Sequence, residues 1–234
     1  MNDSEQNKKE FFDKMKIKES EAYAEQGDAK AQFKLGACFY NGTGVEKDSV
    51  KGVEWITKSA QQGYATAQYN LGRCYKDGEG VEQDYKQSVK WYTKAAEQGN
   101  SWAQNNLGLC YEYGDGVRKN YKKAVEWYRK AAEQGADIAQ YHLAKCYANG
   151  SGVNKDLKKA VEWYAKAAKQ GNAFAEFYLG VCYERGEGVR RNYKKAVEWY
   201  TKAAEQGVPE AQYNLAVLNE CGIGVKKNPA KSKE

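Results

Sequence analysis

A repeat of 36 residues constrains the fold of this 234-residue chain more than any other feature of its sequence. The stretch NYKKAVEWYRKAAEQG at 120–135 returns at 192–207 as NYKKAVEWYTKAAEQG, with the looser DLKKAVEWYAKAAKQG at 156–171. A Gly-x-Gly-Val motif keeps the same step, with glycine pairs at Gly42-Gly44, Gly78-Gly80, Gly114-Gly116, Gly150-Gly152, Gly186-Gly188 and Gly222-Gly224. Self-similarity at one period predicts an array of equivalent units, so each residue is interpreted as a member of its column.

Each unit has the apolar pattern of two helices. In the third unit the apolar positions are Ala103, Leu107, Cys110 and Tyr111 on a first helix, helix A, and Ala124, Tyr128, Ala131 and Ala132 on a second, helix B. These spacings place each set on one face of its helix. Gly114 is expected to end helix A in the left-handed conformation, and Asn120 is expected to cap the start of helix B.

Glutamate and lysine stand four residues apart on the far side of helix B. The order that favours an i, i+4 ion pair recurs at Glu126 with Lys130, Glu162 with Lys166 and Glu198 with Lys202. This side is therefore expected to face water.

One helix pair cannot bury its apolar side alone, but stacking on the next pair buries it. We therefore predict an all-α fold, an α/α solenoid that forms a right-handed superhelix of 36-residue helix-turn-helix repeats. The expected organisation is an N-terminal capping helix region over 1–26 and a repeat array over 27–225, with five full repeats plus helix A of a sixth. Residues 226–234 would be a tail or a truncated helix B.

The repeated pattern A-Q-x-x-L-G-x-x-Y-x-x-G-x-G-V-x-x-[DN]-Y-x-K-A-V-x-W-Y-x-K-A-A-x-Q-G resembles the Sel-1-like repeat (SLR) family, which is related to tetratricopeptide repeats. The resemblance covers roughly residues 27–225 and departs from the pattern only locally, for example at Gly52 and Ser88, which replace a helix-B alanine. It implies that helices A line the concave side of the superhelix and hold a protein or peptide.

Composition is that of an ordinary folded chain, with 41% hydrophobic and 29% charged residues and a net charge of +6. The N-terminal stretch lacks the apolar core of a Sec-type signal, and no run approaches the roughly 18 apolar residues of a membrane span. We expect a soluble protein of a reducing, cytoplasmic compartment, and secretion by a route without a Sec-type signal stays open. The chain is expected to be a monomer or to associate weakly end to end.

The six cysteines do not predict a disulfide or a metal site. Equivalent positions in successive repeats are about 10 Å apart, beyond the reach of a disulfide, and the sequence has no CxxC pair. The evenly spaced column of Cys38, Cys74, Cys110, Cys146 and Cys182 is expected to be buried, whereas Cys221 breaks the register and is expected to be exposed. No metal and no cofactor is predicted.

Catalytic interpretations are weaker than structural ones. The Gly-x-Gly motifs follow helices rather than strands and lack the Gly-Lys-Ser/Thr of a phosphate loop, so they are expected to be turns. His142 is the only histidine, and a nucleophile formed with Cys146 has nothing to orient the imidazole. We predict a protein that is not an enzyme. A remote alternative is a hydrolase or β-lactam-binding protein, because some disulfide-rich repeat relatives have been linked to β-lactam binding.

Variable columns on helix A are the predicted partner-binding surface. Large apolar residues occupy the middle of the least uniform column, and two further rows lie beside it. The predicted binding residues are Trp102, Ile138 and Phe174 in that column, Asn106, His142 and Tyr178 one turn further along, and Arg73, Leu109 and Lys145 in a third row. Such an aromatic strip with polar tips is typical of an interaction hot spot. Packing of Trp102, Ile138 and Phe174 as extra core is the alternative.

Basic residues give a second interpretation. The pairs Arg118-Lys119, Arg190-Arg191 and Lys226-Lys227 occupy one loop position of the repeat, so one loop edge becomes more basic toward the C-terminus. RNA or an acidic surface could bind there, although glutamates share the same helices and no aromatic stacking platform is evident. A solvated ridge is the simpler interpretation, and nucleic acid is not the favoured partner.

Overall fold

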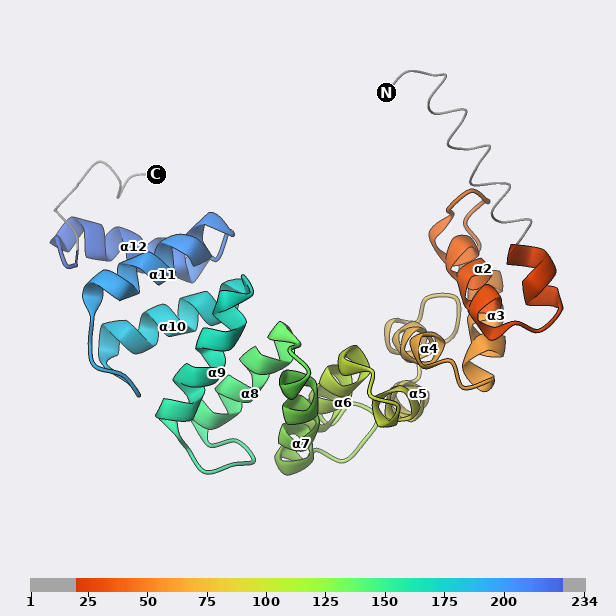
Figure 1. Cartoon of the computed structure of the whole chain (residues 1–234), viewed down its shortest axis with the longest axis horizontal. Coiled ribbons are helices and arrows are strands. Elements are labelled where there is room, and N and C mark those ends of the chain that lie inside the picture. Colours follow the sequence, from red (N-terminus) through yellow and green to blue (C-terminus); the bar gives the residue numbers. More distant parts are fainter. Residues whose placement is uncertain (1–19, 225–234) are drawn as a thin grey trace, which may run out of the picture. The chain divides into compact units, whose positions relative to one another are not determined.

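The computed structural model describes residues 20–224, and the regular elements in this range are all helices (Figure 1). They are α2 (Ala29–Asn41), α3 (Ser49–Gln61), α4 (Ala65–Asp77), α5 (Tyr85–Glu97), α6 (Ser101–Tyr113), α7 (Tyr121–Glu133), α8 (Asp137–Asn149), α9 (Leu157–Lys169), α10 (Ala173–Arg185), α11 (Tyr193–Glu205) and α12 (Pro209–Cys221). Even-numbered helices are the predicted helices A and odd-numbered ones from α3 the predicted helices B. This confirms the all-α repeat fold.

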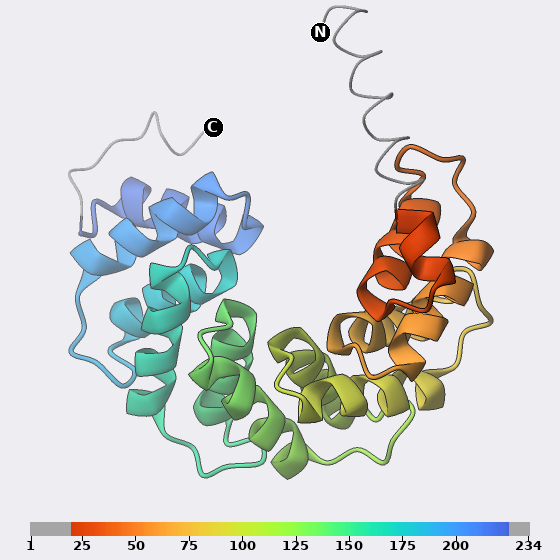
Figure 2. The same cartoon turned by 45° about the vertical axis from the view of Figure 1, so that its right-hand side comes forward.

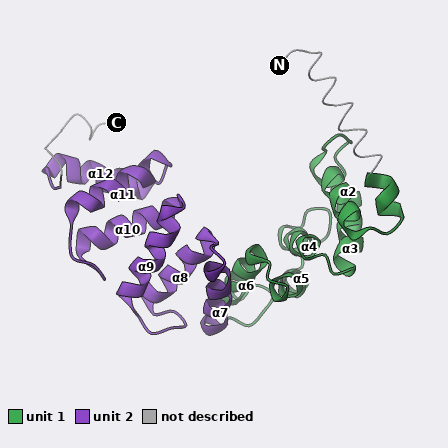
Figure 3. Ribbon diagram, in the orientation of Figure 1, with its two compact units in different colours: residues 1–119 green, residues 120–234 purple. Residues whose placement is uncertain are grey.

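The chain forms two compact units, which Figure 3 colours separately. Unit 1 spans residues 1–119 and contains α2 to α6, and unit 2 spans 120–234 and contains α7 to α12. The predicted capping region over 1–26 lies mostly outside the described residues, although residues 20–25 are helical. The predicted tail over 226–234 lies outside them altogether.

Consecutive helices pack against each other within each unit (Figure 2). In unit 2 the core between the pairs consists of one tyrosine column from helix B and one leucine column from helix A. Tyr128, Tyr164, Leu143 and Leu179 are each at most 2% exposed. Small residues let the helices approach closely, since a Cβ on Gly180 would lie 2.6 Å from the Tyr200 ring.

The predicted ends of the helices are confirmed. Gly114 follows α6 with φ 90° and ψ 21°, and its N–H donates to the Cys110 carbonyl. Asn120 caps α7, because its Oδ1 accepts from the Lys123 N–H at 3.1 Å. The end of α6 and the start of α7 are therefore fixed by local residue chemistry.

The second glycine of each Gly-x-Gly motif has a role that the motif alone does not indicate. Gly188 has φ +72°, and a Cβ there would overlap the Leu157 carbonyl at the start of α9. The loop therefore rests on helix B of the preceding repeat, and only glycine fits at this close approach.

The lysines on helix B make a different contact from the predicted one. Among the described residues, the ion pairs do not include those expected of Lys130, Lys166 and Lys202. The Nζ atoms of these lysines instead lie 4.1 Å from the Trp127 ring centroid, 3.8 Å from that of Trp163 and 4.2 Å from that of Trp199. An exposed ion pair contributes little to stability. A lysine over an aromatic ring gains a cation–π attraction and can also bury its apolar stem.

A column of glutamines joins successive repeats, and the sequence analysis did not identify it. The Nε2 of Gln140 donates to the Ala132 carbonyl at 3.1 Å, and its Oε1 accepts from Gln170 at 2.9 Å. The same donation to the preceding helix is made by Gln32, Gln68, Gln104 and Gln212. In the fifth repeat the position is Glu176, which accepts from Gln206 at 2.7 Å and is 4% exposed.

Candidate functional site

The nine predicted binding residues lie on helices A of both units. Unit 1 carries Arg73 on α4 and Trp102, Asn106 and Leu109 on α6. Unit 2 carries Ile138, His142 and Lys145 on α8, and Phe174 and Tyr178 on α10.

Unit 2 gathers four of its five predicted residues around Tyr141 of α8. The Tyr141 ring centroid lies 5.1 Å from that of His142, 6.0 Å from that of Phe174 and 5.9 Å from that of Tyr178. The Lys145 Nζ lies 5.9 Å from the Tyr141 centroid. Ring separations in this range are those of favourable aromatic pairs, so α8 and α10 present one continuous aromatic cluster. Ile138 is half-buried and takes part in none of these ring contacts.

Two stacked pairs anchor this cluster to the core. His142 stacks on Tyr128 with centroids 5.0 Å apart, and Tyr178 stacks on Tyr164 with centroids 5.5 Å apart. Burial raises the pKa of the Tyr164 phenol, so that ring is neutral and serves as an apolar platform. His142 and Tyr178 are consequently held by packing, and each is half-buried.

Phe174 differs from its neighbours because 55% of its surface is exposed. It extends the Tyr141 cluster outward from the core. An aromatic ring this exposed, with an ordered aromatic layer behind it, is a suitable anchor for a partner.

Unit 1 arranges its predicted residues differently. Trp102 is 55% exposed, as Phe174 is at the same repeat position. Asn106 and Leu109 line one small pocket of about 20 Å³ together with Tyr92, whereas Arg73 lines another, of about 110 Å³. Burial raises the pKa of the Tyr92 phenol, and the nearby Asn106 amide partly opposes that rise. Asn106 is therefore a polar group beside the core tyrosine, whose buried hydroxyl makes no hydrogen bond within the described residues.

Tyr141 is the residue that the sequence analysis missed. It follows the glutamine of helix A, and the same position carries Phe33, Tyr69, Phe177 and Tyr213 in other repeats. This nearly uniform aromatic column is visible in the sequence, but a uniform column is as typical of core as of a binding surface. Asn105 is the exception in the column.

The cysteine column behaves as predicted in four of its five members. Cys74, Cys110, Cys146 and Cys182 are buried, Cys38 is half-buried, Cys221 is exposed, and all six are free thiols. Burial raises the pKa of Cys74, Cys110 and Cys182 to about 11, so these thiols stay protonated at neutral pH. Across residues 20–224 no three histidine, cysteine, aspartate or glutamate side chains are placed to hold a metal ion. No helix of this range combines the length and apolar character that crossing a membrane requires.

The helices form pairs with a Gly-x-Gly loop between the two members, and a column of glutamines links successive pairs. Such stacked pairs define an α/α repeat protein. The Sel1 repeat family model matches residues 29–64, 65–100, 103–135, 137–172, 173–208 and 209–234, so the chain belongs to the Sel1 repeat family. Sel1 repeat proteins generally mediate protein–protein interactions, and their scaffold is typically non-enzymatic.

Solved structures agree with this assignment. A protective antigen of uropathogenic Escherichia coli with an SLR fold is 43% identical, with a TM-score of 0.90 over 93% of this chain. That match covers 46% of the antigen, so this chain spans about half its length. A Sel1 repeat protein from Oxalobacter formigenes is 35% identical, with a TM-score of 0.83 over 94% of this chain and 92% of that one. No curated protein matches the chain.

Proposed function

We propose that this chain is a non-enzymatic adaptor that binds a protein or peptide through helix-A side chains, with Trp102 as an anchor in unit 1 and Phe174 as an anchor in unit 2. The observation that carries the proposal is their exposure, 55% for each, at equivalent positions of two repeats. A water-exposed tryptophan or phenylalanine gains most from burial against a partner. The outer repeats carry Lys30 and Glu210 at this position, so the fold itself does not require an aromatic residue there.

The cluster around Tyr141 supports the same surface in unit 2. Its rings are held by stacking on Tyr128 and Tyr164 through His142 and Tyr178, so little side-chain freedom is lost when a partner binds. Tyrosine and histidine supply polar atoms at the edge of an apolar area, which suits an apolar segment with hydrogen-bonding groups along it. The family's general role in protein interaction agrees with this proposal.

The cysteines support a reducing, cytoplasmic location. All six are free thiols, and protonated buried thiols need no oxidising compartment. We propose that the adaptor acts as a monomer or associates weakly end to end, as stacked repeat units can.

A pull-down from the native lysate tests the binding surface. Changing Trp102, Ile138 and Phe174 together to alanine would remove the whole predicted apolar column, but Ile138 is half-buried and its loss also perturbs packing. The sharper variant combines Trp102→Ala with Phe174→Ala. The matched control combines Tyr23→Ala with Tyr113→Ala, which are 54% and 60% exposed and lie outside the predicted rows.

The expected result is that the Trp102 and Phe174 variant keeps its helical signal and melting temperature and loses proteins that the wild type and the control retain. Equal retention by all three proteins would contradict the proposed surface. A collapse of the melting temperature would show instead that the two side chains are core.

A further inference from the structure

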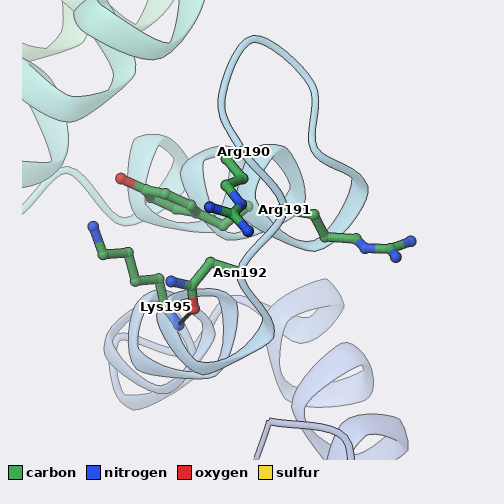
Figure 4. Close-up of a pocket in the computed structure, with 5 residues that line it drawn as sticks. Arg190, Arg191, Asn192 and Lys195 are labelled. Carbon is green, nitrogen blue, oxygen red and sulfur yellow. Dashed lines mark hydrogen bonds between the residues drawn. The ribbon is translucent and has the colours of Figure 1, made fainter.

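A basic pocket in unit 2 shares no residue with the proposed partner surface. Tyr183 of α10, Arg190, Arg191 and Asn192 of the following loop, and Lys195 in the first turn of α11 line a pocket of about 500 Å³. Figure 4 shows the pocket and the side chains around it. It is large enough for a small anion together with the group that carries it.

Two cations of this pocket lack a carboxylate partner. The ion pairs among the described residues involve neither Arg190 nor Lys195. The Lys195 Nζ lies 5.1 Å from the Tyr183 ring centroid. Arg191 extends away from the other labelled side chains in Figure 4, and its guanidinium lies 5.4 Å from the Tyr193 ring. Arg190 and Lys195 are thus the two charges available inside the pocket.

The nearby acidic side chains are engaged elsewhere. Glu187 in the same loop lies 3.9 Å from the Arg185 guanidinium. Glu184 accepts a hydrogen bond from the Tyr200 hydroxyl. Neither carboxylate therefore forms an ion pair with Arg190 or Lys195.

The preceding repeat supplies an internal comparison in the same unit. There Asp156 caps α9, accepting from the Lys159 N–H at 3.0 Å and pairing with the Lys159 Nζ at 3.4 Å. Lys159 lies over Tyr147 at 5.5 Å, as Lys195 lies over Tyr183. The position of Arg190 is occupied by Asn154. The equivalent place in the fourth repeat therefore contains the Asp156 carboxylate and lacks the cation that Arg190 supplies in the fifth.

In the fifth repeat the capping residue is neutral. Asn192 Oδ1 accepts from the Lys195 N–H at 3.0 Å, so the cap is made as well as Asp156 makes it. Its amide nitrogen is a further donor next to two cations. The change from aspartate to asparagine therefore keeps the helix end and removes the negative charge.

We propose that the pocket formed by Tyr183, Arg190, Asn192 and Lys195 binds the phosphate of a phosphate monoester. A monoester carries about −1.5 to −2 charges at pH 7, which two cations match, whereas a carboxylate or a phosphodiester carries only one. The planar guanidinium of Arg190 presents paired donors to phosphate oxygens, and Lys195 adds a point charge. The Tyr183 ring forms one wall, against which the carrier of the phosphate can pack.

The test uses the full 15N-labelled chain titrated with inorganic phosphate at constant ionic strength, with the backbone amides of residues 190–195 as the readout. We expect saturable shifts in the wild type. Asn192→Asp retains a good cap but places a negative charge beside the anion, so affinity should fall by roughly tenfold with an unchanged melting temperature. Arg190→Asn, the residue of the preceding repeat, should weaken binding similarly. An unchanged affinity in both variants would overturn the proposal.

A transplant gives an independent check. Asn154→Arg combined with Asp156→Asn recreates the pocket in the preceding repeat, so phosphate should then also shift the amides of residues 154–159. Equal shifts at 154–159 in the wild type would show diffuse attraction to basic loops and would reject a specific pocket.

Three further probes identify the source of the phosphate. Binding of O-phosphoserine at least as tightly as inorganic phosphate supports a phosphorylated partner, and tighter binding of inorganic phosphate supports the free ion. Equal affinity for dimethyl phosphate or acetate would overturn the assignment to a monoester. Trp102 and Phe174 are unchanged throughout, so the outcome is independent of the proposed partner surface.

Discussion

At position 176 the fifth repeat has a carboxyl group where the other repeats have glutamine. The five glutamines each donate an N–H to a carbonyl of the preceding helix, but an ionised carboxylate has no hydrogen to donate. Burial raises the pKa of Glu176, Gln206 and Lys202 oppose this rise, and Glu205 adds to it. The folded chain therefore holds this proton more tightly than the unfolded chain does.

Replacing Glu176 by glutamine should stabilise the protein at neutral pH. A raised acid pKa means that the contribution of Glu176 to stability is greatest below its ordinary value of 4.5 and is lost as pH rises through the raised value. Glu176→Gln cannot lose a proton and restores the donor. We expect a gain of about 1 kcal/mol at pH 7, and a higher melting temperature by about 2–4 °C. Thermal unfolding followed by circular dichroism measures it.

The gain should shrink as the pH is lowered toward 4.5, because Glu176 then becomes a neutral donor itself. Gln140→Glu in the preceding repeat is the matched control and should lose stability at neutral pH. A pH-independent difference between wild type and Glu176→Gln would contradict the account.

Single residues show what the sequence could and could not predict. The capping role of Asn120 followed from side-chain chemistry within three residues, so it was predictable. The pairing of Lys130 was not predictable in the same way, because Glu126 four residues earlier and Trp127 three residues earlier are both within its reach. Spacing alone does not rank an exposed ion pair against a ring contact. The role of Tyr141 depends on rings from three helices, which no local pattern specifies.

At the scale of the elements, the loop glycines divide into two kinds. Gly188 and Gly171 both have positive φ, +72° and +85°. A Cβ on Gly188 would overlap the Leu157 carbonyl, whereas nothing lies within 4 Å of a Cβ on Gly171. Gly171→Ala should therefore cost only the backbone conformation, about 1–2 kcal/mol, and Gly188→Ala should cost clearly more. Urea unfolding of the two variants compares them, and equal losses would show that the loop does not rest on α9.

The leucine column tests how the helix pairs support one another. Leu143 is fully buried between neighbouring repeats, whereas Leu215 on α12 is only half-buried. Leu143→Ala should cost about 2–5 kcal/mol because it leaves a cavity in a closed core. Leu215→Ala should cost less, because its site has more exposed surroundings that can relax. Comparable losses in denaturant unfolding would contradict nearest-neighbour stacking.

At the scale of the whole molecule, the 36-residue repeat period was enough to predict most of the fold. One period predicted helix type, helix ends and neighbour packing, because each unit satisfies its own backbone groups and stacks only on adjacent units. The candidate surface was less predictable, since exposure depends on what each neighbour covers. Trp102 and Phe174 are exposed and Ile138 is half-buried at the same repeat position, although all three are large and apolar.

Salt dependence should separate the two proposed sites of the molecule. The net charge of +6 comes from 37 basic and 31 acidic residues that are interspersed, so long-range attraction to an anion is weak and binding at the pocket depends on Arg190 and Lys195 at short range. Raising salt from about 0.05 M to about 0.5 M screens those charges, so phosphate affinity measured by calorimetry should fall steeply. Partner binding through Trp102 and Phe174 should hardly change, because burial of apolar surface does not depend on charge screening. If salt weakened partner binding as steeply as phosphate binding, the partner would be held by the basic loops, and the aromatic surface would not be its main site.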